Sequence, residues 1–401
     1  MKKLNNTIKT NITTIIGVFL IISPFLDLFT SIGIKYNIDQ LRVGIIIRGL
    51  FMLLMIYYSI FLKDNKKQTI IFLSVIFTYI ALFLTKTILT NGNITYETTV
   101  IFKTFYFIIL SITFINLEKP IDIKYYIACF TTYLLLVFIP NILNIGFNSY
   151  EIAKVGQVGW FNSANEISTI LSILTPILIA YLMTKKNKIL SVLYLIIILI
   201  TFFSIGTKVP ILSLAIICGF YLLYSLYKLI RKKDTKKITF ILTGLFIIII
   251  STVILLPKTS FYKNIKIHLE YLEVDNIVEI FTDTELIDHF LLGSRLKLLS
   301  QNIKTYKESS TVEILLGIGA EHRQSEMDFF DIFINYGIIG FALIATILII
   351  LIIKQKPKYT TNTKLSLLLA ITIAFLSGHV LVSPAVSIFI PLLLFDKSMV
   401  K

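Results

Sequence analysis

The chain has 401 residues, of which 56% are hydrophobic, 13% are aromatic and 15% are charged, and its formal net charge is +15. Soluble domains average about 25% charged residues, and a soluble fold could not hide this much apolar surface behind a polar exterior. Intrinsic disorder is excluded, and so is a disulfide scaffold, because Cys129 and Cys218 lie far apart inside apolar runs. The sequence predicts a polytopic integral membrane protein.

The predicted spans follow from the length of the apolar runs. A helix needs about 20 apolar residues to cross a hydrocarbon core about 30 Å thick, and spans are expected to be helices because lipid leaves no partner for unpaired backbone groups. About twelve runs meet this requirement. They lie near residues 12–33, 41–62, 69–90, 99–117, 124–146, 164–184, 188–205, 209–230, 237–256, 327–353, 364–382 and 384–396, the last of them short.

The connections between these runs predict the orientation. Lys and Arg cluster in every second connection, so that with both termini roughly 23 of the 38 basic residues fall on one side. The positive-inside rule makes that side, and both termini, cytoplasmic. The first apolar run has no small-residue cleavage site before it ends, so we interpret it as a span and not as a removed signal.

One connection on the predicted outer face is far longer than the others. It divides the chain into helices over residues 1–256, an extracytoplasmic loop over 257–326, and helices over 327–401. A connection of this length is expected to hold structure of its own. Residues 286–306 have helical periodicity, which predicts an amphipathic helix on the membrane or over the bundle; a folded loop remote from any chemistry is equally compatible.

The familiar motifs of soluble enzymes are absent from the sequence: there is no Walker phosphate loop, no Cys-x-x-Cys and no His-Glu-x-x-His. The Gly317-Ile-Gly319 segment is interpreted as a turn before the next helix in preference to a nucleotide loop. No motif for a metal or a cofactor is recognised among these residues.

Three carboxylates mark the start of the run at 327–353. Ser325 followed by Asp328 fits a capping box, with Ser325 as the N-cap. Glu326 and Asp328 would then lie in the first turn, where acids favour the helix dipole. Asp331 would lie about one turn further in. A carboxylate inside a span is costly and indicates a polar cavity.

Other polar residues lie near the predicted outer ends of spans or, for Arg295 and Arg323, in the long outer loop. Singly, each is most simply a snorkelling or interfacial residue. Together they indicate a cationic, partly intramembrane site suited to a diphosphate, with a nearby Glu or His to accept a proton. The predicted diphosphate ligands are Arg48, Lys103, Lys208, Arg295 and Arg323, and the predicted polar cavity adds Asn162, Asn165, Glu166, Asp331 and His379.

The order of several loose motifs resembles the O-antigen polymerase and O-antigen ligase superfamily of bacterial membrane glycosyltransferases. The motifs are residues 24–27, residues 159–165 with Pro176, residues 206–208, residues 293–295, residues 317–319 before Glu326 and Asp328, residues 336–340, and Gly378 with His379. The resemblance covers nearly the whole chain and includes the long outer loop before the last spans.

The resemblance implies a fold like that of GT-C-type membrane glycosyltransferases in the bacterial cytoplasmic membrane. It implies an outward-facing site that takes a polyprenyl-diphosphate-linked oligosaccharide and transfers it with inversion, without a metal or a nucleotide sugar. The product would be capsule, exopolysaccharide or O-antigen, and a flippase and a chain-length regulator would be partners.

Ligases of this superfamily usually carry His-Asn where this chain has Glu326-Met327. That departure favours a polymerase of repeat units, with the ligase as the alternative. The predicted catalytic residues are Glu326, His322 and Asp328, with Glu326 preferred over His322 as the base. A transporter or flippase is a third reading, but the halves show no repeat and the charges lie at one face instead of the midplane.

Overall fold

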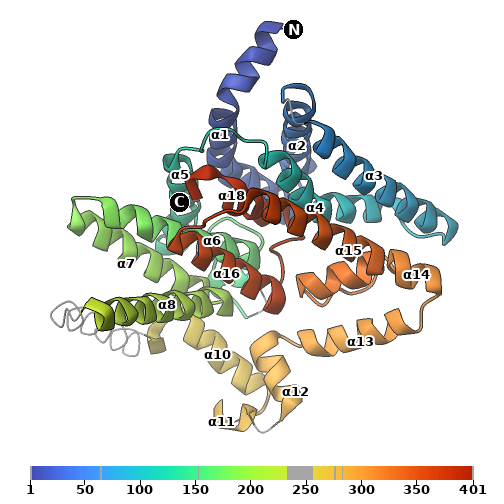
Figure 1. The fold of residues 1–401 in the computed structure, drawn as a ribbon. Helices are drawn as coiled ribbons and strands as arrows, with labels where there is room; N and C mark the ends of the chain where they lie inside the picture. Colours follow the sequence, from blue (N-terminus) through green and yellow to red (C-terminus); the bar gives the residue numbers. More distant parts are fainter. Residues whose placement is uncertain are drawn as a thin grey trace.

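The computed structural model describes residues 2–63, 66–151, 153–232, 256–274, 277–281 and 283–399. These residues form a helical bundle with one small β-hairpin (Figure 1). The N-terminus and helices α10 to α13 lie at opposite ends of the molecule. The long helices are α1 (Lys2–Lys35), α2 (Gly44–Phe61), α3 (Lys66–Leu89), α4 (Ile94–Phe114), α5 (Ile123–Ile142), α6 (Ala164–Thr184), α7 (Lys188–Ile205), α8 (Lys208–Lys232), α15 (Asp328–Gln355) and α16 (Thr361–Leu376).

Among the described residues, eight helices are long and apolar enough to cross a membrane. Three shorter apolar helices accompany them, at Ile189–Ile205, Thr361–Leu376 and Pro384–Phe395, the last made of α17 (Pro384–Ser387) and α18 (Phe389–Phe395). The predicted run at 237–256 lies, except for its last residue, outside the described residues. The prediction of a polytopic membrane protein is confirmed, and the count of twelve stays a prediction.

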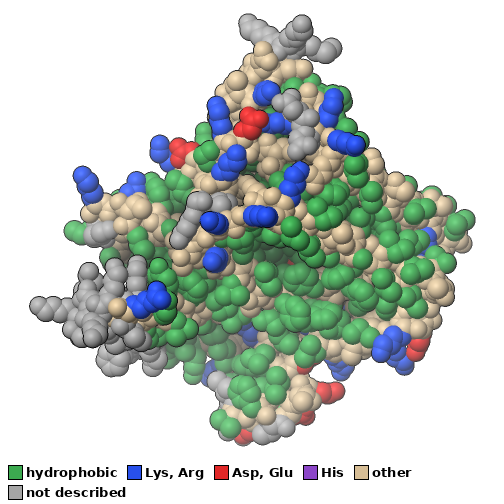
Figure 2. Space-filling view, viewed as in Figure 1, with side chains coloured by type: hydrophobic (Ala, Val, Ile, Leu, Met, Phe, Trp, Pro, Cys, Tyr) green, Lys and Arg blue, Asp and Glu red, His purple; other side chains and the backbone are tan. Residues whose placement is uncertain are grey.

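Burial separates the central helices from those at the periphery. In α4 and α6, 72% of the most apolar window is buried, against 28% in α3 and 22% in α8. Helix α4 packs against α2, α3 and α18, whereas α6 packs against α5, α8 and α16. Figure 2 shows hydrophobic side chains across the middle of the visible face and Lys and Arg gathered above them, near the N-terminal end. An exposed apolar surface of this extent suits lipid as its surroundings.

Helix α15 is broken, which the continuous prediction over 327–353 missed. Gly337 has φ 63° and ψ −172°, so residues 328–336 and 338–355 form separate helical segments. The backbone N–H groups of Ile318 and Gly319 donate to carbonyl oxygens of residues 334 and 335, each at 3.1 Å. A Cβ atom on Gly317 would lie 2.0 Å from the carbonyl oxygen of Asn335. The segment Gly317–Gly319, predicted as a turn, is an irregular connection without a turn, and it docks on the carbonyls that the break releases.

The segment before α15 is mostly helical. After a 3-10 turn (Leu256–Lys258) it contains α10 (Ser260–Tyr271), α11 (Ile277–Ile280), α12 (Thr284–Ile287), a π-helical turn (Asp288–Leu292), α13 (Arg295–Lys307) and α14 (Thr311–Leu316). The single helix predicted over 286–306 is wrong, because Gly293 and Ser294 both adopt a left-handed conformation, each with φ 64°. Leu299 and Tyr306 of α13 pack with Met327 and Ile334, so α13 covers the start of α15.

A β-hairpin connects α5 to α6. Strands β1 (Asn148–Tyr150) and β2 (Val155–Gln157) are antiparallel, with Asn148 opposite Gln157. The hydroxyl of Ser149 donates to the carbonyl oxygen of Ile205 at 2.5 Å, which ties the hairpin to the end of α7. The hairpin therefore lies at the same end of the bundle as α10, which packs against β2.

Candidate active site

A polar cavity of about 500 Å³, the first cavity, lies where the starts of α4, α6, α13 and α15 meet the loop after α16. The structure brings eight predicted site residues to its wall. They are Lys103, Glu166, Arg295, Arg323, Glu326, Asp328, Asp331 and His379. These residues come from distant parts of the sequence, so the fold, and not local spacing, assembles them.

The carboxylate of Glu326 has two basic side chains beside it in this cavity. Arg295 donates from Nη2 to Oε2 of Glu326 at 2.6 Å, and Nε2 of His379 lies 3.8 Å from the same oxygen. The nearby imidazole of His379, together with the hydrogen bond and charge of Arg295, lowers the pKa of Glu326 to about 2. Burial lowers the pKa of His379, but Glu326, Glu166 and Asp328 outweigh that effect and raise it overall. Glu326 is therefore an anion at neutral pH.

The backbone is constrained on both sides of this contact. Glu326 has φ 59° and His379 has φ 61°, a left-handed conformation that non-glycine residues rarely adopt. Gly378 also has a positive φ, and a Cβ atom there would lie 2.4 Å from the carbonyl oxygen of Glu326. Strained residues of this kind persist where the surroundings hold them, and they cluster at functional sites.

Asp328 and Asp331 organise the loops around Glu326. Asp328 is fully buried and accepts hydrogen bonds from the backbone N–H groups of residues 379, 380 and 381 at 2.9, 2.8 and 2.7 Å. Asp331 accepts from the backbone N–H and the hydroxyl of Ser325 at 2.9 and 2.7 Å. With these oxygens already engaged, both carboxylates hold backbone in place beside the cavity.

The predicted capping box is wrong. Helix α15 begins at Asp328, and its N-cap, Met327, makes no side-chain capping bond. Ser325 is not the cap because its hydroxyl donates to Asp331. Glu326 therefore lies before the helix, with its side chain on the cavity wall, instead of in the first helical turn.

A larger, mainly apolar cavity of about 870 Å³, the second cavity, adjoins the first. Its apolar wall includes Ile211, Leu212, Phe261, Ile265, Phe290 and Leu292. The predicted residues Asn162, Asn165 and Lys208 line this cavity, and Nζ of Lys208 lies 5.0 Å from the centre of the Phe290 ring. Gly293 and Arg295 line both cavities, so Arg295 stands at their junction.

His268 of α10 also lines the second cavity, although no sequence motif predicted it. Burial, together with the nearby Lys208 and His289, lowers the pKa of His268 to about 4, so its imidazole is neutral at pH 7. The only signal in the sequence is spacing, since residues 261, 265 and 268 recur at helical intervals on one face of α10. That spacing alone does not identify a site.

Arg48 and His322 line neither cavity. Arg48 is buried and donates to Oδ1 of Asp27 at 2.5 Å, while the hydroxyl of Tyr133 donates to Oδ2 of Asp27 at 2.5 Å. Arg48 therefore lies away from both cavities, and its charge is already neutralised by Asp27 inside the bundle. His322 is half-buried, and burial lowers its pKa.

Sequence comparison assigns the chain to a family. A family model described as O-antigen ligase like membrane protein matches residues 9–285 and 278–396. The chain belongs to this family. No curated protein and no solved structure matches it. As an O-antigen ligase-like protein it is a multi-pass membrane enzyme of the glycosyl-transfer type, which acts on lipid-linked glycans in polysaccharide assembly. The predicted superfamily is confirmed.

Proposed function

We propose that the protein polymerises oligosaccharide repeat units carried on polyprenyl diphosphate, at the outer face of the bacterial cytoplasmic membrane. The position of Arg295 at the junction of an apolar and a polar cavity carries the proposal. A lipid-linked sugar has the same order of parts: a hydrocarbon chain, a diphosphate and a glycan. The chain would occupy the second cavity and the glycan the first.

The diphosphate would lie between the cations of the two cavities. Arg295 can present its guanidinium to phosphate oxygens in bidentate fashion, and Lys208 supplies a point charge from the apolar side. Lys103 and Arg323 add charge from the polar side. Preorganised cations of this kind stabilise the charge that develops on a leaving diphosphate.

The reaction is a single displacement. The acceptor hydroxyl attacks the anomeric carbon of the donor, the bond from that carbon to the diphosphate oxygen breaks, and the configuration inverts. Glu326 accepts the hydroxyl proton, and the polyprenyl diphosphate leaves with the electron pair. Glu326 is favoured over His322 because its carboxylate lines the first cavity. We assign Asp328 a positioning role, since its oxygens hold backbone.

Donor binding would also make Glu326 a stronger base. In the free protein the carboxylate is paired with Arg295, and this pairing contributes to its low pKa of about 2. A diphosphate that draws the charge of Arg295 to itself removes part of that stabilisation, so the pKa of Glu326 rises towards its ordinary value. The base would thus become active when the donor is in place.

A ligase that transfers the finished glycan to a terminal acceptor is the second candidate, because the family model itself is named for ligases. The polymerase is preferred because Glu326-Met327 stands where ligases usually have His-Asn. In either case a flippase would supply the donor, and a chain-length regulator would be a partner of the polymerase.

Mass spectrometry of lipid-linked glycans in a strain that lacks the protein tests the proposal. We expect single repeat units to accumulate on the outer leaflet, with recovery of polymer when the full chain is restored. Long lipid-linked chains would indicate a ligase instead. Single units confined to the cytoplasmic leaflet would indicate a flippase and overturn the enzyme assignment.

A further inference from the structure

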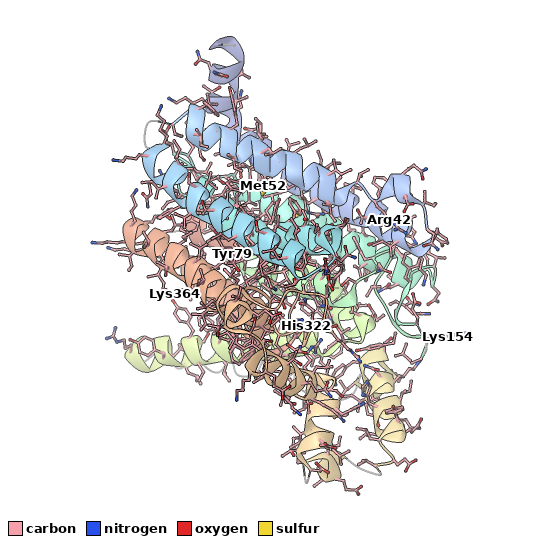
Figure 3. All side chains as sticks on the ribbon, turned by 90° about the vertical axis from the view of Figure 1, so that its right-hand side faces the viewer. Arg42, Met52, Tyr79, Lys154, His322 and Lys364 are labelled. Atoms are coloured by element: carbon pink, nitrogen blue, oxygen red, sulfur yellow. The ribbon has the colours of Figure 1, made fainter. Side chains whose placement is uncertain are left out.

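A third cavity of about 340 Å³ has a different chemistry from the other two. Most of its wall is amides, hydroxyls and ammonium groups, and none of its lining residues is acidic. The polar residues of the wall are Asn141, Asn144, Asn148, Lys154, Gln157, Ser204, Ser260 and Lys263. Lys154 lies on the turn of the hairpin, at the edge of the molecule (Figure 3).

A shared wall separates this cavity from the apolar second cavity. In the hairpin, Ser149 and Tyr150 line the second cavity, whereas Asn148 and Gln157 line the third. In α10, the residues at 261, 265 and 268 line the second cavity, whereas those at 260 and 263 line the third. The side-chain amide of Asn264 donates to the carbonyl oxygen of Gly206 at 3.2 Å, which fixes α10 against the end of α7.

Part of the wall is held by internal hydrogen bonds. The amide of Asn141 donates to Ser204 and to the carbonyl oxygen of Gln157, both at 2.9 Å, and its oxygen accepts from the backbone N–H of Gly159 at 3.0 Å. Other groups remain available. Among the described residues, the side chain of Asn148 has no hydrogen-bond partner, and neither Lys154 nor Lys263 makes an ion pair.

We propose that the third cavity binds an oligosaccharide that bears carboxylate groups. Amide side chains can donate to and accept from sugar hydroxyls, and two unpaired ammonium groups without an opposing acid favour an anion. The inference rests on the proposed function only in taking this ligand to be part of the glycan that the protein assembles. The site would hold the glycan outside the reaction centre, across the wall from the lipid chain.

The only tryptophan of the chain, Trp160, provides a probe of this site. Its ring N–H donates to the carbonyl oxygen of Ile145 at 3.2 Å. The backbone N–H of the preceding residue, Gly159, donates to the side-chain oxygen of Asn141 in the wall of the third cavity. The full chain in lipid nanodiscs is titrated with tetragalacturonic acid while Trp160 fluorescence is recorded. Saturation-transfer NMR on the same samples reports binding independently of the fluorescence.

We expect saturable binding of tetragalacturonic acid, and binding of the neutral maltotetraose at least about tenfold weaker. The double variant Lys154→Gln, Lys263→Gln should weaken binding of the acid about tenfold. Lys266→Gln is the matched control. Lys266 lies on α10, as Lys263 does, but it pairs with Glu270 and does not line the third cavity.

Absence of binding by both methods would overturn the proposal. So would equal affinity for maltotetraose or inorganic phosphate, or a double variant that behaves as Lys266→Gln does. Glu326→Gln should bind the acid as the unchanged protein does. If the protein binds the acid but has no polymerase activity, the binding site is supported and the proposed function is refuted. The failure of one proposal can therefore be told from the failure of the other.

Discussion

Two arginine–carboxylate pairs in this protein have nearly the same geometry and different surroundings. Arg48 lies 2.5 Å from Asp27, and Arg295 lies 2.6 Å from Glu326. The side chains of the first pair are 6% and 12% exposed, and those of the second are 16% and 46% exposed. The first pair joins α1 to α2 inside the bundle, whereas the second faces two cavities. Access to a ligand, and not the pairing itself, separates a structural pair from a candidate catalytic one.

The largest expected effect is on the buried pair. Arg48→Met leaves the carboxylate of Asp27 buried without its counter-charge, and breaking a buried pair in this way costs about 3–5 kcal/mol. We expect a large drop in the midpoint of thermal unfolding in detergent. The double variant Asp27→Leu, Arg48→Met should recover most of the loss, because no unpaired charge remains. If Arg48→Met were fully stable and lost only donor binding, Arg48 would be a diphosphate ligand and not a structural residue.

The exposed pair should respond in the opposite way. Arg295→Gln removes a charge-assisted contact worth about 1.5–3 kcal/mol, so the KM for the lipid-linked donor should rise about 10- to 100-fold. Stability should change by less than about 1 kcal/mol, as is usual for partly exposed pairs. Lys304→Gln, on the solvent side of the same helix, is the control for a change of charge alone. A large loss of stability with an unchanged KM would show that the Arg295–Glu326 pair is structural, as the Arg48–Asp27 pair is.

The smallest expected effect is the pH dependence of stability at the exposed pair. The pKa of His379 is raised in the folded protein, so its contribution is complete below about pH 6.5 and is lost as the pH rises through the folded value. The pKa of Glu326 is lowered, so its contribution is lost only as the pH falls from about 4.5 towards about 2.

Thermal unfolding measured from pH 6 to pH 9 checks this expectation. The midpoint should fall slightly over that interval, by an amount equivalent to at most about 1 kcal/mol. His379→Asn should flatten the fall, while its effect at pH 9 should be small. A slope that is unchanged in His379→Asn would mean that another group carries the dependence.

The sequence was a good guide to the helices and to the kinds of residue at the site. Apolar length identifies most of the described helices, and eight of the predicted polar residues line one cavity. The sequence could not distinguish Arg48 from Arg295, because nothing close to either residue in the sequence shows which carboxylate it pairs with. Their partners, Asp27 and Glu326, are 21 and 31 residues away, and only the packed fold brings each pair together.

Other features depend on contacts between distant segments for the same reason. The break at Gly337 is stabilised by hydrogen bonds from the connecting segment at residues 317–319, so helix propensity within α15 does not reveal it. Ser325 failed as a cap because Asp331 competes for its hydroxyl. His268 lines the second cavity, and the third cavity forms, only because α10 packs against the hairpin. Local patterns predict elements, whereas the site is assembled by tertiary packing.

The most direct test of the account is turnover by Glu326→Gln. Purified protein in nanodiscs is supplied with a lipid-linked repeat unit, and polymer formation is measured beside donor binding. Loss of a general base typically costs about 10²- to 10⁴-fold in rate. We expect kcat to fall by that amount while donor affinity is retained. His322→Ala is the control, and its loss of kcat should be far smaller. Full turnover by Glu326→Gln, or a loss confined to His322→Ala, would contradict the account.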